Sequence, residues 1–130
     1  MANELIPGKE NMVSLLSGGG ISDVIKPLSK EIFLFDSYVA GTTHLEDESI
    51  LKEIKEGDKL ILQREDNRFD GNAILILDEK KRKLGYVPEK DNVVFARLMD
   101  AGKLLVARIK KHEMTGSFHK ISISIYLVDF

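Results

Sequence analysis

The sequence predicts a small, partly closed antiparallel β-barrel of the OB or SH3 kind, mainly β with two short helices (α+β). Short apolar runs of strand type recur along residues 31–130 and are separated by polar turns. Two helical stretches interrupt them, in the order strand, helix, three strands, helix, two strands. Most connections are too short for the crossover of a parallel βαβ unit, so about six antiparallel strands are expected.

The composition limits the possible classes of protein. The chain has 130 residues with 43% hydrophobic and 31% charged content, which is ordinary for one globular domain. It has no cysteine, which excludes disulfides and thiolate metal sites and favours a cytoplasmic location. We expect no membrane span and no signal peptide. The net charge of -2 argues against bulk attraction to polyanions, so any nucleic-acid site must be local.

Residues 1–30 differ from the rest and are expected to form an arm with short helical segments. Gly18–Gly20 would be a flexible joint between two apolar sets, and no Lys-Ser/Thr follows as a phosphate loop requires. We expect the arm to dock on a protein partner or a second copy, because its apolar side chains must be covered. The two sets are Met12, Val13, Leu15 and Leu16, and Ile21, Val24, Ile25 and Leu28.

The first half of the 31–130 domain begins with a strand over Ile32–Ala40. Asp47 can cap a short helix, Glu48–Lys55, whose apolar residues share one face. The strand Lys59–Arg64 follows it.

The next strands are expected at Asn72–Leu77 and Lys83–Val87. The basic run Lys80–Lys83 between them could bind phosphate, but hairpin tips favour charge, and a solvated tip is the simpler interpretation.

The last part contains a helix and two strands. Pro88 suits the first helical position and Gly102 the end of that helix. The strand Lys103–Lys111, a turn over Met114–His119 and a final strand with alternating isoleucines follow. The expected apolar side of the helix is Val94, Phe95, Leu98 and Met99.

The polar connection Arg64–Asn72, between two strands, is the most informative stretch. Its Asp, Asn and Gly residues bend a chain by local hydrogen bonds or positive φ. Phe69 is not needed for a turn, and an exposed aromatic ring loses the stabilisation of burial. We therefore expect Phe69 either to fold into a core or to offer a stacking face to a ligand.

The sequence gives little support for a catalytic site. Glu65, Asp66 and Asp70 could hold Mg²⁺ as in a nuclease, but acidic turn residues are mostly caps and solvated groups. Neither a nucleophile elbow nor a P-loop is present. We expect no metal, no cofactor and no catalysis. No metal-ligand spacing relates the three histidines, His44, His112 and His119.

Binding of unpaired bases is better supported, because small barrels stack bases on exposed aromatic side chains. The candidate rings are Tyr38, Phe69, Tyr86 and Phe118. The cations that could meet phosphates are Arg64, Lys110, Lys111 and Lys120. For any one ring alone, a half-buried core position with a wet hydroxyl is the simpler interpretation.

Three separated blocks of the sequence resemble the HIRAN domain family. They are Phe35–Gly41, Leu62–Ile74 and Leu84–Pro88, and the resemblance covers residues 32–130 in the family's order. It implies an OB-like barrel that captures the 3′ end of single-stranded DNA, as in SNF2-type ATPases acting in DNA repair at stalled replication forks. With no ATPase motif, the chain is similar to the free-standing bacterial and phage type.

The resemblance also implies roles for individual residues. Tyr38 and Phe69 would sandwich the terminal base, and Asp70 would accept a hydrogen bond from the 3′-hydroxyl group. The loop is one residue shorter than the family pattern and lacks its two prolines, so it is expected to be less preorganised.

Further contacts follow from the same resemblance. Asn67, or Asp66, would contact the base edge or the sugar, and Tyr86 would approach the phosphate. Phe118 would stack another base. Ser37 stands where a DNA-capturing relative carries arginine.

The prediction is therefore a non-catalytic module that recognises single-stranded DNA 3′ ends. The alternative is a protein-interaction adaptor, in which the barrel is a scaffold and residues 1–30 bind the partner. A metal-dependent nuclease is the third hypothesis.

Overall fold

The computed structural model describes residues 30–45 and 47–129, and residues Glu31–Val128 form one compact unit. The predicted arm and its glycine joint lie outside the described residues. The described elements are β1 (Lys30–Tyr38), the 3-10 helices η2 (Thr42–His44) and η3 (Glu48–Lys52), β2 (Lys59–Arg64), β3 (Ile74–Leu77), β4 (Lys83–Tyr86), α3 (Glu89–Asp100), β5 (Leu104–Thr115) and β6 (Phe118–Asp129).

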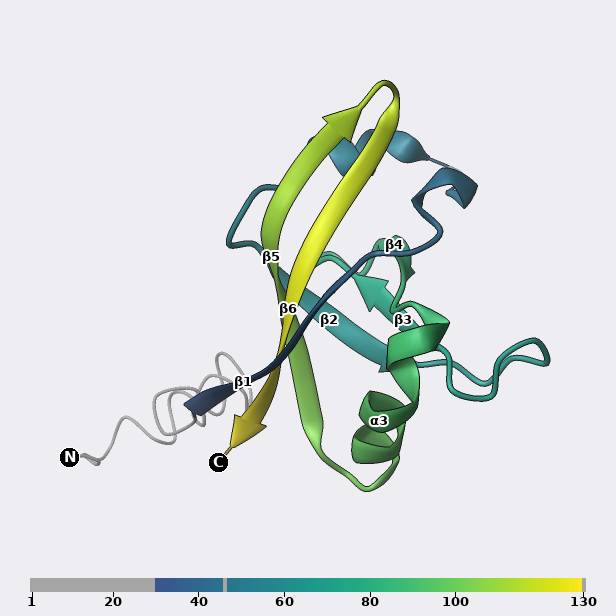
Figure 1. The fold of residues 1–130 in the computed structure, drawn as a ribbon, viewed down its shortest axis with the longest axis vertical. Coiled ribbons are helices and arrows are strands. Elements are labelled where there is room, and N and C mark those ends of the chain that lie inside the picture. Colours follow the sequence, from purple (N-terminus) through teal and green to yellow (C-terminus); the bar gives the residue numbers. More distant parts are fainter. Residues whose placement is uncertain (1–29, 46, 130) are drawn as a thin grey trace. The chain divides into compact units, whose positions relative to one another are not determined.

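The six strands form one curved sheet in the order β1-β6-β5-β2-β3-β4 (Figure 1). The β2–β3, β2–β5, β3–β4 and β5–β6 pairs are antiparallel. Just after β1, Ala40 pairs with Tyr86 of β4: Ala40 N donates to Tyr86 O at 2.8 Å, and Tyr86 N to Ala40 O at 2.9 Å. This bridge joins the two ends of the strand order, so the predicted small antiparallel barrel is confirmed.

Alternating side chains build the core of the barrel. On β6, Ile121, Ile123 and Ile125 are buried, as the sequence predicts. On α3 the buried residues are Asn92, Phe95 and Ala96, at the spacing of one helix face. The prediction that Val94 faces the core is wrong, since it is 65% exposed. The face of α3 that contacts the core instead contains Phe95 and Ala96.

Several element boundaries differ from the prediction for local reasons. The first helix is the shorter η3, capped by Asp47, which accepts from Ser49 N at 3.0 Å. The strand β3 begins at Ile74, because Asn72 N bonds the Asp70 side chain and stays in the loop. Pro88 is the N-cap of α3, so the helix begins at Glu89, one residue later than predicted.

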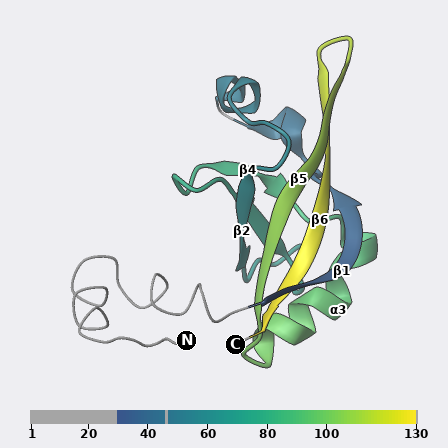
Figure 2. The ribbon, with the colours of Figure 1, turned by 90° about the vertical axis from the view of Figure 1, so that its left-hand side faces the viewer.

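The β5–β6 hairpin is longer than predicted and stands out in both views (Figures 1 and 2). Thr115 pairs with Phe118, so the turn contains only Gly116 and Ser117. Gly116 has φ 62°, which a two-residue hairpin turn favours at its first central position.

Two histidines meet on this hairpin. His112 Nε2 of β5 and His119 Nδ1 of β6 are 2.8 Å apart, so one ring donates and the other accepts. His119 is buried, and this burial lowers its pKa, with a smaller contribution from His112. The nearby charges Glu48 and Lys52 on η3 have smaller, opposing effects.

We expect this pair to make stability depend on pH. Because the folded pKa of His119 is lowered, the unfolded state takes up a proton first as the pH falls. The stabilisation is complete above pH ~6.5 and is lost below it, by up to ~1.4 kcal/mol per pH unit. Urea denaturation between pH 7.5 and 5 should show a flatter pH dependence for His119→Gln than for the parent. Parallel curves would contradict this assignment.

Candidate nucleic-acid interface

The loop between β2 and β3 is held by its own side chains. Asn67 Oδ1 accepts hydrogen bonds from Phe69 N at 2.9 Å and Asp70 N at 2.8 Å, while Asn67 Nδ2 donates to Glu65 Oε2 at 3.0 Å. Asp70 Oδ1 accepts from Asn72 N at 2.9 Å. Side-chain hydrogen bonds thus order this proline-free loop locally.

Arg64 braces the base of the loop. Its guanidinium donates to Ala73 O at 2.7 Å and Gly71 O at 2.9 Å. Its Nε donates to Asp100 Oδ1 at 2.9 Å, and this bond lowers the pKa of Asp100. The geometry gives Arg64 a positioning role, and the phosphate contact expected of it stays a prediction.

Asp70 is fixed from the helix as well as from the loop. Its Oδ2 accepts a hydrogen bond from Asn92 Nδ2 of α3 at 2.8 Å. Asn92 is only 1% exposed. Sequence reasoning missed Asn92, although a polar residue on the inward face of a predicted helix was a usable signal, because buried amides need partners.

Four predicted site residues lie together in one pocket of about 320 Å³: Asn67, Phe69, Asp70 and Tyr86. We call it the loop pocket; its other lining residues are Ala40, Ala73, Val87, Pro88 and Glu89. Phe69 is 83% exposed, with the Arg68 guanidinium carbon 5.0 Å from its ring centroid. Phe69 therefore does not fold into the core, and its ring is open to a ligand.

Tyr86 is half-buried and donates its hydroxyl to Glu65 Oε2 at 2.8 Å. Burial raises the pKa of Tyr86, and the bond to the carboxylate adds to this effect. The pKa of Glu65 is lowered by its hydrogen bonds from Asn67 and then Tyr86. At neutral pH this side of the loop pocket therefore holds a neutral phenol bonded to a carboxylate.

Tyr38 lines a different pocket, of about 350 Å³, which we call the lysine pocket. Tyr38 is 40% exposed, and Lys90 Nζ lies 5.4 Å from its ring centroid. Within the described residues, no ring contact joins Tyr38 to Phe69. The lining residues of the lysine pocket are Asp36, Ser37, Tyr38, Lys90, Lys110, Lys111, Lys120 and Ser122.

The remaining candidates lie outside both pockets. Phe118 is 46% exposed at the tip of the β5–β6 hairpin, and Asp66 is exposed in the loop. Across residues 30–45 and 47–129, no group of three or more His, Asp or Glu side chains could hold a metal ion.

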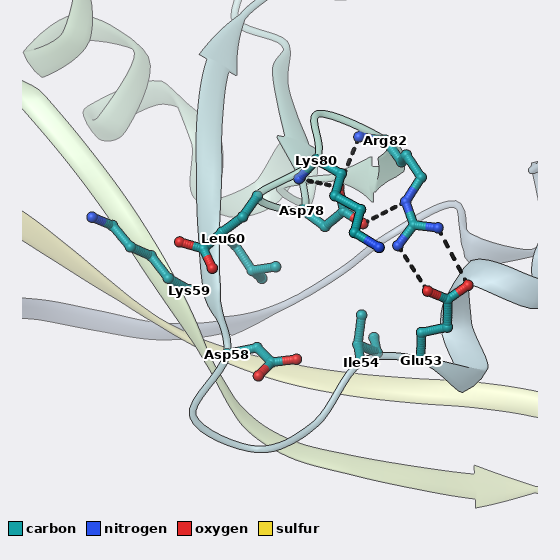
Figure 3. Close-up of a pocket in the computed structure, with 9 residues that line it drawn as sticks. Glu53, Ile54, Asp58, Lys59, Leu60, Asp78, Lys80 and Arg82 are labelled. Atoms are coloured by element: carbon teal, nitrogen blue, oxygen red, sulfur yellow. Dashed lines mark hydrogen bonds and ion pairs between the residues drawn. The ribbon is translucent and has the colours of Figure 1, made fainter. Parts of the chain in front are cut away.

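Lys80 and Arg82 of the basic run in the β3–β4 turn line a third pocket, of about 200 Å³ (Figure 3). Arg82 Nε donates to Asp78 Oδ2 at 2.8 Å, and Arg82 Nη2 to Glu53 Oε1 at 3.1 Å. Asp78 is buried and also accepts from Lys80 N and Arg82 N. These bonds give Arg82 a structural role, unlike the fully solvated tip that the sequence suggests.

Comparison with protein-family models matches residues 32–128 to the HIRAN domain. The chain belongs to the HIRAN domain family. HIRAN domains are DNA-binding modules and are not themselves catalytic. Within residues 30–45 and 47–129, no helix is long and apolar enough to cross a membrane.

Two solved structures share the HIRAN fold of this chain. A protein from Lactobacillus plantarum has a TM-score of 0.72 and 25% identity, covering 78% of this chain and 99% of that one. The HIRAN domain of human HLTF has a TM-score of 0.62 and 15% identity, covering 78% and 79%. A search of curated proteins finds no match. The predicted family is thus confirmed.

Proposed function

We propose that this HIRAN protein captures the 3′ end of single-stranded DNA in the loop pocket, without catalysis. The observation that carries the proposal is the pairing of an exposed Phe69 ring with the fixed Asp70 carboxylate in one pocket. The ring offers a face for the terminal base, since every base can stack. The carboxylate offers an acceptor for a sugar hydroxyl.

The chemistry of Asp70 supports recognition of a free hydroxyl group. An ionised carboxylate accepts through about four lone-pair positions, and Asn72 and Asn92 donate to two of them. A 3′-hydroxyl group can donate to a remaining position. A 3′-phosphate cannot donate when ionised, and its charge would be repelled by the carboxylate.

Asn67 and Tyr86 support the site in different ways. The Asn67 side chain already bonds the loop backbone and Glu65, so its main contribution is to hold Phe69 and Asp70 in place. The Tyr86 hydroxyl would have to exchange Glu65 for a phosphate oxygen in order to donate to DNA.

Asp70→Asn tests end recognition. We expect the parent to bind a 3′-hydroxyl oligonucleotide more tightly than its 3′-phosphate form, and the variant to lose this preference. Hydrogen bonds to charged groups contribute ~1.5–3 kcal/mol, so the loss should be roughly 10- to 150-fold in Kd. Fluorescence anisotropy with the two labelled oligonucleotides measures it.

Glu56→Gln is the control, because it removes one carboxylate charge at an exposed residue outside both pockets. Its preference for the hydroxyl end should equal that of the parent. A parent protein that binds both ends equally would overturn end capture.

A further inference from the structure

We infer that a second copy of this chain binds along β1, so that the two β1 strands pair antiparallel about a two-fold axis and form a dimer. This inference goes beyond the proposed function and does not depend on it. Four features of the molecule carry it: the outer edge of β1, the exposed apolar residues of that strand, the groove beside them, and the order of the charges along the strand.

The outer edge of β1 is open to pairing. β1 lies at one end of the strand order, with β6 as its neighbour. In the part of the chain that the structure describes, no strand pairs with the opposite edge of Ile32–Phe35. Edge strands present backbone N–H and C=O groups to other chains, and natural proteins usually protect them with charged residues or proline. The stretch Ile32–Phe35 contains neither, so nothing in its sequence opposes pairing.

The same stretch exposes large apolar side chains. Ile32 is 42% exposed, Phe33 54% and Phe35 42%. The Phe33 ring contacts Tyr126 edge to face with the centroids 5.9 Å apart, and the Phe35 ring contacts Phe95 at 5.8 Å. These contacts hold both rings in place and leave much of each ring exposed. An apolar surface of this kind is typical of a protein–protein contact.

An apolar groove of about 390 Å³ lies between β1 and α3 (Figure 2). Lys90 and Asp91 line its polar part and bond to each other at 3.1 Å. Side chains of a partner strand that enter this groove would remove its apolar surface from water, including that of Val94 on α3. The apolar lining residues are Leu34, Phe35, Val94, Phe95 and Leu98.

The order of charges along β1 favours a second copy as the occupant. When β1 pairs antiparallel with itself about Phe33, Lys30 lies opposite the partner subunit's Asp36, and Ile32 lies opposite the partner subunit's Leu34. Two pairs of opposite charge then flank an apolar centre. The Asp36 side chain is 43% exposed, so it can accept from a second cation. An axis at Leu34 would instead place Asp36 opposite the partner subunit's Ile32, so the charges select the axis at Phe33.

Sedimentation velocity of the full chain tests the dimer. Because the paired stretch is short, we expect a mass that rises with concentration toward twice the 14.6 kDa of one chain, over roughly 1–200 μM. Ile32→Lys places a charge in the apolar centre on both sides of the axis. It should raise the Kd of the dimer by at least ~100-fold, because two isoleucine contacts are lost. Its Tm should stay close to that of the parent when both are monomeric.

Leu104→Lys is the matched control. It makes the same kind of change at a strand residue that is 48% exposed, on β5, which is not a neighbour of β1 in the sheet. Its dimer should have the same Kd as that of the parent.

A disulfide cross-link tests the register. The chain has no cysteine, so Phe33→Cys carries one thiol, which would face its counterpart across the axis. The Cα atoms of opposite residues in antiparallel strands are ~4.5–5.5 Å apart, within the reach of a disulfide. Oxidation with diamide should therefore give a covalent dimer of Phe33→Cys on a non-reducing gel, and little with Leu104→Cys.

A parent that remains a monomer over this range would overturn the proposal and leave the groove to a segment of another protein. A dimer that survives Ile32→Lys would also overturn it, as would a Phe33→Cys cross-link no stronger than that of Leu104→Cys. Either result would place the contact elsewhere, as the role expected of residues 1–30 allows. None of these measurements involves DNA, so their outcome is independent of end capture.

Discussion

Replacing Phe69 by alanine is expected to weaken binding of a 3′-hydroxyl oligonucleotide by roughly 5- to 150-fold. Stacking of one base on an aromatic ring contributes ~1–3 kcal/mol. Phe69 is the most exposed large apolar side chain of the described residues. Its removal therefore leaves no cavity, and the free energy of unfolding should change by less than ~0.5 kcal/mol. The Phe69→Ala variant should therefore lose affinity for the oligonucleotide while keeping nearly the stability of the parent.

Anisotropy titration and urea denaturation measure the two quantities on the same protein. Phe69→Tyr should keep the affinity, because the stacking face is retained. Phe33→Ala removes another exposed ring, outside both pockets and outside the predicted site, and is the matched comparison. Equal losses in Phe69→Ala and Phe33→Ala would contradict a special role for the loop pocket.

Replacing Gly85 by alanine is expected to cost ~1–3 kcal/mol of stability, a typical cost of overpacking. A Cβ atom at Gly85 would collide with the carbonyl oxygen of Ala40 and lie 2.7 Å from Val39 Cγ1. The oxygen belongs to the backbone and accepts the bond from Tyr86 N that closes the barrel. It cannot move aside without loosening that bridge.

Thermal denaturation should show the loss as a fall in Tm of about 4–8 °C per kcal/mol for a domain of this size. Gly71→Ala is the control, because an added Cβ there meets nothing within 4 Å and Gly71 has no positive φ. Its Tm should stay close to that of the parent. Equal stability of Gly85→Ala and Gly71→Ala would contradict the packing argument.

Local patterns in the sequence were sufficient for most of the fold. The alternation of β6 and the Asp47 cap depend on neighbours along the chain, and both are visible without coordinates. The orientation of α3 was harder to predict. By polarity alone, Val94 should be buried and Asn92 exposed, and the structure shows the reverse. Asn92 is buried because Asp70, 22 residues away, accepts its hydrogen bond.

The candidate site was predictable where one short loop supplies its residues. Asn67, Phe69 and Asp70 come from that loop, and the structure places them in one pocket with Tyr86. Contacts over long distances in the sequence were not predictable. Arg64 looks like a free cation in the sequence, yet its partner Asp100 is 36 residues away.

The bridge between Ala40 and Tyr86 links the stability of the barrel to ligand binding. Both residues line the loop pocket, so a molecule bound there contacts the bridge that joins the two ends of the sheet. A molecule that binds only the form in which this bridge is intact stabilises that form and makes opening of the bridge less favourable. Conversely, a substitution that leaves the bridge open in part of the molecules lowers the apparent affinity in proportion to that fraction.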